Sequence, residues 1–175
     1  MGFVSILSQK SDKIVIFPRN KPFGTLFVID KSEYNYLKER RITMNFNNFT
    51  IKAQEAVQEA VNLTQAHNGQ VIEPIHLLQA VMKVGENVTK FIFQKLGVNG
   101  QQIANVVARQ IESLPKVSGG NPYLSRESND VLQKAVQYSK EMGDEFVSIE
   151  PIILALLAVK STASSILKDA GVSEK

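Results

Sequence analysis

One apolar phrase occurs twice in this chain. Residues 72–82 read IEPIHLLQAVM and residues 149–159 read IEPIILALLAV. Each phrase places a proline directly after a glutamate and then continues with mostly apolar residues. Proline is favoured at the first helical position, where its missing N–H would have no partner, so each phrase predicts the start of a buried helix. The duplication therefore predicts a fold made of two related halves.

The segments before the two phrases also repeat. Each predicts a helix with a hydroxyl residue as its N-cap, Thr50 in the first half and Ser125 in the second, 75 residues later. In the first helix we expect Ile51, Ala56, Val57, Ala60, Val61 and Thr64 to face inward, and in the second Val131, Leu132, Ala135 and Val136. The phrases themselves are 77 residues apart, so we expect the second half to have gained two residues before its phrase.

The segments after the phrases complete the pattern. The first half continues with VTKFIFQKLG and the second with SSILKDAGVS, which aligns Gly97 with Gly171. A further amphipathic helix precedes Pro115, and its counterpart in the second half would begin where the sequence stops, at Lys175. Glycine and proline residues mark 115–124 as an exposed linker.

These observations predict an all-α domain in which two pseudo-twofold-related four-helix repeats share one core, with the last helix truncated. The first repeat covers residues 44–114 and the second covers residues 125–175. Helices joined by such short loops should be antiparallel to their neighbours. We expect the helices of both phrases to lie at the centre and Leu154 to be part of the shared core.

Residues 1–43 differ from the rest of the chain. KIVIFP and TLFVID are β-leaning runs that predict a hairpin, and SEYNYLKERR predicts a helical stretch. We expect an N-terminal extension outside the helical fold, with Met44 as a possible biological start. The alternative is an edge hairpin docked on the domain.

Composition excludes several classes of protein. Eight of the 20 Lys and Arg residues lie in residues 1–43, against four of the 17 Asp and Glu residues, so the remainder carries 12 basic and 13 acidic residues. The main body therefore has no concentrated basic face for nucleic acid. The chain has no cysteine, which is compatible with the cytoplasm, and no apolar run of about 20 residues. Its two histidines, His67 and His76, lie on different predicted helices, so we expect no metal site and a packed His76.

At this point the chain resembles a known family. The segment MNFNNFTIKAQEAVQEAVNLTQAHNGQVIEPIHLLQAVM and the later GDEFVSIEPIILALL resemble the N-terminal domain of Clp-type AAA+ chaperones, with the ClpB disaggregases as the nearest branch. The resemblance implies a domain that recruits misfolded or aggregated polypeptides to a hexameric ATP-driven ring, in cooperation with a DnaK-type chaperone system. The sequence lacks the G-x-x-x-x-G-K-[ST] phosphate loop. We therefore expect a non-catalytic chain without a cofactor, with ATP and Mg²⁺ bound by AAA+ modules outside it.

The resemblance also implies functional residues. Thr50, Asp144 and Glu150 match positions that the family needs for chaperone activity. The residues themselves also allow a structural interpretation, because a threonine caps a helix and a glutamate at a helix N-terminus interacts favourably with its dipole.

The family's apolar substrate groove lies between the fifth and sixth helices. Tyr138, Pro151 and Ile152 match that region. Tyr138 follows Val136 by two residues, so it should turn away from the core stripe, and it either binds substrate or covers a helix junction. Lys134 lies one helical turn before it and makes the groove less apolar.

Two other functions stay open at this stage. In related Clp unfoldases the same fold docks adaptor proteins for a protease. The basic N-terminal part instead allows a small all-α DNA-binding regulator, which would bind with a steep salt dependence. We favour a protein-binding module that is monomeric in isolation and contacts neither nucleic acid nor membrane.

Overall fold

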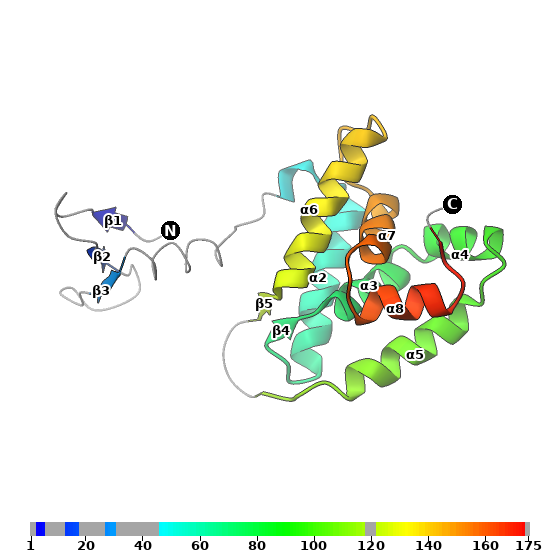
Figure 1. The fold of residues 1–175 in the computed structure, drawn as a ribbon, viewed down its shortest axis with the longest axis horizontal. Helices are drawn as coiled ribbons and strands as arrows, with labels where there is room; N and C mark the ends of the chain where they lie inside the picture. The colour runs from blue at the N-terminus through cyan, green and yellow to red at the C-terminus, as the bar shows by residue number, and fades with distance from the viewer. Residues whose placement is uncertain (1–2, 6–12, 18–26, 31–45, 118–121, 174–175) are drawn as a thin grey trace. The chain divides into compact units, whose positions relative to one another are not determined.

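The computed structural model describes residues 3–5, 13–17, 27–30, 46–117 and 122–173. The chain divides into two compact units, Met1–Asn45 and Phe46–Lys175, which are considered separately (Figure 1).

The described part of the first unit is a small antiparallel sheet. Its strands β1 (Phe3–Ser5), β2 (Lys13–Phe17) and β3 (Phe27–Asp30) lie in the order β1-β2-β3. Strands β2 and β3 pair as the predicted hairpin, with Ile14 opposite Ile29, whereas β1 was not predicted. The predicted helical stretch SEYNYLKERR lies outside the described residues.

The second unit is helical, which confirms the predicted all-α fold class. A 3-10 turn, η1 (Phe46–Asn48), precedes the first long helix. The helices are α2 (Ile51–Ala66), α3 (Pro74–Val84), α4 (Glu86–Lys95), α5 (Gly100–Glu112), α6 (Arg126–Glu141), α7 (Ile149–Ala158) and α8 (Thr162–Asp169). Among the described residues, no single helix has the length and apolarity to cross a bilayer; only α7 and α8 taken together do, with a 95° bend between them.

The first and third helices of each repeat end with the same geometry. Asn68, Gly97, Gly143 and Gly171 all have positive φ and follow the ends of α2, α4, α6 and α8. After α6, the amide of Asp144 donates to the carbonyl of Ser139 at 2.9 Å. After α2, the amide of Gly69 donates in the same way to the carbonyl of Thr64 at 2.8 Å. This left-handed closure satisfies carbonyls that a helix end would otherwise leave without a partner.

Two short β contacts link the repeats symmetrically. Phe49, before α2, forms a parallel bridge with Val147, before α7. The strands β4 (Val71–Ile72), before α3, and β5 (Tyr123–Leu124), before α6, form the equivalent parallel pair. In each repeat, the segment before the first helix therefore pairs with the segment before the second helix of the other repeat. A twofold relation between the repeats requires this arrangement.

The spacing expected for the second phrase is wrong. Glu73 is the N-cap of α3, whereas Ser148 is the N-cap of α7, so Glu150 and Pro151 already lie inside the helix. The structurally equivalent residues are 75 apart here as well, and the loop has gained no residues. Burial follows the same spacing, because half-buried Leu154 matches half-buried Gln79. The two IEP sequences are therefore offset by two residues in the first turns of equivalent helices.

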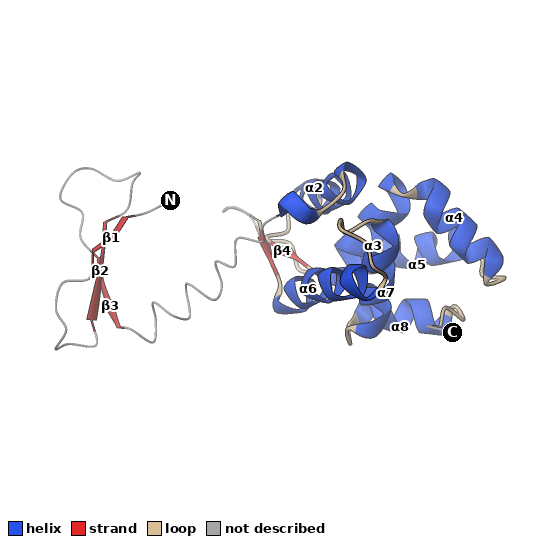
Figure 2. Cartoon of the chain, turned by 90° about the horizontal axis from the view of Figure 1, so that it is seen from above, coloured by secondary structure: helices blue, strands red, loops and turns tan. Residues whose placement is uncertain are grey.

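Helices α3 and α7 pack against each other and form the centre of the unit (Figures 1 and 2). Around them lie α2, α5, α6 and α8, and α4 packs on α3 and α5. Fully buried side chains of the core include Leu77, Leu78, Ile103, Leu132, Ile152, Leu156 and Leu167. Five residues that were expected to face inward are not fully buried. Ile51 is exposed, and Val57, Val61, Val136 and Leu154 are half-buried.

Candidate functional site

The Phe49–Val147 bridge brings together three site residues that are far apart in the sequence. Thr50 caps α2, because its Oγ1 accepts a hydrogen bond from the amide of Ala53 at 3.2 Å. The amide of Thr50 donates to the carbonyl of Val147 at 2.9 Å. Since Val147 lies in the short loop between Asp144 and Glu150, all three predicted residues surround one backbone contact.

The turn after α6 holds this loop in a fixed shape. Ser139 is buried, and its hydroxyl donates to the carbonyls of Phe146 at 3.0 Å and Asp144 at 3.3 Å. Gly143 has a φ of 79°, a conformation that side chains with a Cβ rarely adopt. The loop therefore presents its outer side chains from a rigid backbone.

The two carboxylates of the site are exposed. Ser148 donates its hydroxyl to the Oε2 of Glu150 at 2.6 Å, which orients that carboxylate over the first turn of α7. Negative charge at this position interacts favourably with the helix dipole and with the free amides of the first turn. Both carboxylates remain accessible to a binding partner.

The residues predicted to line the groove separate into two groups. Tyr138 is half-buried on α6, and the Nζ of Lys134 lies 4.9 Å from the centre of its ring. Pro151 is buried and Ile152 is completely buried, so both side chains belong to the core of this structure. Of the three, Tyr138 alone reaches the surface.

Three apolar side chains in the segments that lead to and from the bridge are exposed, and the sequence analysis did not predict their exposure. Ile51 is 76% exposed, Met142 49% and Phe146 46%. Ile51 directly follows Thr50, and Phe146 directly precedes Val147, so they flank the bridge from its two strands. We call Ile51, Met142 and Phe146 the apolar rim. A signal existed for Phe146, because neighbouring residues of an extended segment point to opposite sides and Val147 is buried.

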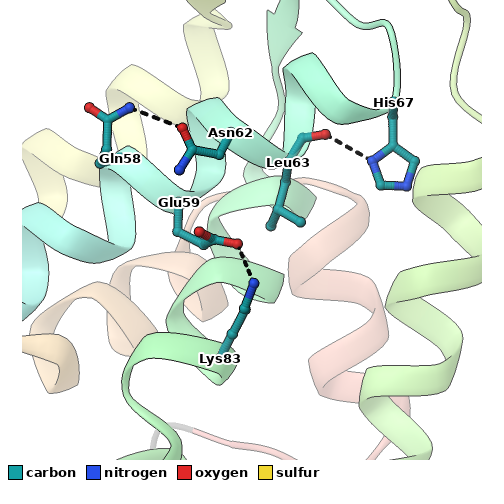
Figure 3. A network of polar contacts seen from close by, with 6 residues as sticks. All are labelled: Gln58, Glu59, Asn62, Leu63, His67 and Lys83. Carbon is teal, nitrogen blue, oxygen red and sulfur yellow. Dashed lines mark hydrogen bonds and ion pairs between the residues drawn. The ribbon is translucent and has the colours of Figure 1, made fainter.

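The equivalent end of the other repeat has a different chemistry. With the spacing of 75, Arg126 stands in place of Ile51, His67 in place of Met142 and Val71 in place of Phe146. Arg126 is exposed, and His67 turns back on its own helix with Nδ1 2.8 Å from the carbonyl of Leu63 (Figure 3). The backbone of the two ends is alike, whereas these three equivalent positions carry large apolar side chains at one end and Arg126, His67 and Val71 at the other.

His76 is packed, as predicted. It is 3% exposed, and its Nδ1 accepts a hydrogen bond from the amide of Glu73 at 3.0 Å, which helps to cap α3. Burial, followed by the charge of His67, lowers the pKa of His76 to about 4. Burial, followed by the charge of Glu127, raises the pKa of Glu73. Within the described residues, no group of three or more potential ligands could hold a metal ion.

A cavity of the helical unit lies elsewhere. It has a volume of about 650 Å³ between α3, α4 and α5, with Gln79, Phe93 and Val107 among its lining residues. No residue of the bridge or of the apolar rim lines it.

Comparison with known proteins places this fold in a family. Residues 48–170 match the family model of the Clp repeat N-terminal domain, and the chain therefore belongs to the Clp repeat N-terminal domain family. Its relatives include the chaperone protein ClpB of Bacteroides thetaiotaomicron, 79% identical over 132 residues, and ClpB of Porphyromonas gingivalis, 54% identical over 132 residues. Each match covers 75% of this chain and 15% of the relative. The predicted resemblance is confirmed.

Solved structures share the fold. The Hsp104 N-terminal domain of Candida albicans has a TM-score of 0.65 at 23% identity, covering 73% of this chain and 84% of that chain. The N-terminal domain of ClpD from Arabidopsis thaliana has a TM-score of 0.58 at 20% identity, covering 75% and 90%. At these identities the likeness shows the architecture alone.

Proposed function

We propose that this chain is the substrate-recruiting N-terminal domain of a ClpB-like disaggregase and that it binds misfolded or aggregated polypeptides. The supporting observation is the apolar rim, which gathers at the same bridge as Thr50, Asp144 and Glu150. An unfolded chain offers apolar side chains, and three exposed side chains of this kind on a rigid backbone suit brief contacts with many sequences. The contact is non-catalytic in this proposal.

The ATP-driven step belongs to AAA+ modules outside this chain. We expect the isolated chain to be a monomer, and the hexameric ring and the cooperation with a DnaK-type system to need those modules. In the cytoplasm the domain would concentrate aggregated polypeptides above the ring.

The test compares two exposed phenylalanines. Phe146 lies in the apolar rim, and Phe91, on α4, is 59% exposed and lies outside it. Binding of a permanently unfolded protein, such as reduced and carboxymethylated α-lactalbumin, is measured by fluorescence anisotropy. We expect Phe146→Ser to weaken binding about fivefold, which corresponds to about 1 kcal/mol of lost apolar burial, and Phe91→Ser to change it less than twofold.

Native α-lactalbumin and duplex DNA serve as further ligands. The proposal is supported if the domain binds unfolded α-lactalbumin but neither native α-lactalbumin nor duplex DNA. Equal losses in the two variants, or no loss in Phe146→Ser, would contradict the assignment of the apolar rim. Tight binding of duplex DNA with a steep salt dependence would instead favour a nucleic-acid function.

A further inference from the structure

Lys134 covers one face of the half-buried Tyr138 ring, four residues before Met142 of the apolar rim. The two residues are four apart on α6, and the Lys134 Nζ lies 4.9 Å from the centre of the Tyr138 ring. This is the distance of a cation–π contact, which attracts the ammonium to the ring face. Met142, the C-cap residue directly after α6, follows Tyr138 by four positions.

The residue equivalent to Lys134 in the other repeat has an ion-pair partner, which Lys134 lacks among the described residues. There Glu59, on α2, forms an ion pair with Lys83, on α3, with 2.7 Å between Oε1 and Nζ (Figure 3). The residue of α7 that corresponds to Lys83 is Ala158. Within the part of the chain that the structure describes, Lys134 forms no ion pair. Among the described residues, the contact that the structure shows for the Lys134 ammonium is the Tyr138 ring. The ammonium can therefore move aside when a ligand occupies the face of that ring.

We propose that Lys134 is a specificity-determining residue of the polypeptide-binding surface, because it withholds the face of Tyr138 from uncharged apolar segments. This inference rests on the proposed function. An apolar side chain that stacks on the ring must first displace the ammonium, and the lost cation–π contact is subtracted from the gain in apolar burial. A domain without this lysine would therefore bind neutral apolar segments more tightly.

The test replaces the charge and keeps the length of the side chain. The probe is an uncharged synthetic peptide rich in phenylalanine and leucine, labelled for fluorescence anisotropy. We expect Lys134→Met to bind it about two- to fivefold more tightly than the unchanged protein, which is the range of an exposed cation–π contact. Lys134→Arg keeps a cation over the ring and should change the affinity less than 1.5-fold. Lys140→Met removes a charge from an exposed position of the same helix and should also have little effect.

A double-mutant cycle separates a ring effect from a general change of charge. In a Tyr138→Leu background, Lys134→Met should no longer improve binding. The proposal is overturned if Lys134→Met leaves the affinity unchanged or lowers it, if Lys140→Met produces the same gain, or if the gain persists without the ring. If any of these results is found while unfolded α-lactalbumin still binds and Phe146→Ser weakens that binding, only the role of Lys134 is refuted and the proposed function stands. If the unchanged protein binds unfolded α-lactalbumin but not the peptide, the role of Lys134 is refuted; if it binds neither, both proposals are refuted.

Discussion

Two leucines of the central helix provide a direct test of how the repeats are aligned. Leu156 is completely buried, whereas Leu154, two residues earlier and therefore on the opposite side of α7, is half-buried. With the spacing of 75, Leu154 corresponds to half-buried Gln79. With the spacing of 77 suggested by the duplicated phrase, it would correspond to Leu77, which is 1% exposed. The same substitution at the two leucines therefore measures the alignment.

The expected magnitudes differ clearly. Leu156→Ala should lower the free energy of unfolding by about 2–5 kcal/mol, because the removed atoms leave a cavity that the packed helices cannot close. In a unit of about 130 residues this corresponds to a fall in Tm of roughly 10 °C. Leu154→Ala leaves an open site that water can fill, and we expect a loss of about 1 kcal/mol.

Urea unfolding followed by circular dichroism gives both free energies on one scale, and the slope of each curve shows whether the unfolded state has changed. A loss above 2 kcal/mol for Leu154→Ala, equal to that for Leu156→Ala, would refute the alignment and the burial pattern on which it depends.

Two other predictions concern a titration and a backbone conformation. Because the pKa of His76 falls from 6.5 to about 4, the unfolded chain takes up a proton on acidification before the folded one does, so stability is present above pH 6.5 and is lost as the pH falls towards 4. Between pH 7.5 and 5.5 the free energy of unfolding from urea titration should fall by about 1 kcal/mol, a loss that His76→Gln removes; the raised pKa of Glu73 acts in the opposite sense. Gly143→Ala should cost about 1 kcal/mol in thermal unfolding, since a Cβ there meets no neighbour but the φ of 79° is strained. Gly143→Asn should cost less, because Asn68 adopts a φ of 56° at the equivalent position; equal costs would contradict this explanation.

Local chemistry made the helix ends of this fold predictable. Thr50 and Ser125 are N-caps because their hydroxyls accept from free amides of the first turn, and the structure shows both hydrogen bonds. Asn68 and Gly143 end helices because they tolerate positive φ. Such signals act within a few residues, so one sequence is enough to interpret them.

The alignment of the central helices was not predictable in the same way. The IEP sequence is a strong local resemblance, and it led to a spacing of 77. The structure starts α7 at Ile149, because the bridge at Val147 fixes where the chain enters the helix. That bridge joins residues almost 100 positions apart, and no local pattern contains it. Ile152, which the family resemblance placed in a groove, corresponds to a buried residue at either spacing, Leu77 or Ile75.

The sequence predicted the cap at Thr50 but not which side chains near the bridge are exposed. Thr50 caps α2 and donates its amide to Val147, which lies between Asp144 and Glu150 in the sequence. The role of these three residues in binding stays a prediction. Ile51 was assigned to the core because helical spacing alone cannot tell which residues of a first turn lie beyond the neighbouring elements. Its 76% exposure depends on where the neighbouring helices end, which is a property of the packed fold.

The two ends of the unit show how one backbone supports two surfaces. Caps, left-handed helix ends and β contacts recur in both repeats, and they fix the positions of the loops. The residues that distinguish the ends occupy exposed or half-buried positions, such as Ile51 against Arg126 and Phe146 against Val71. Exposed substitutions usually change stability by less than about 0.5 kcal/mol, so the surfaces could diverge without loss of the fold. The apolar character of one end is therefore not required by folding, and an apolar group that folding does not require is best explained by a binding partner.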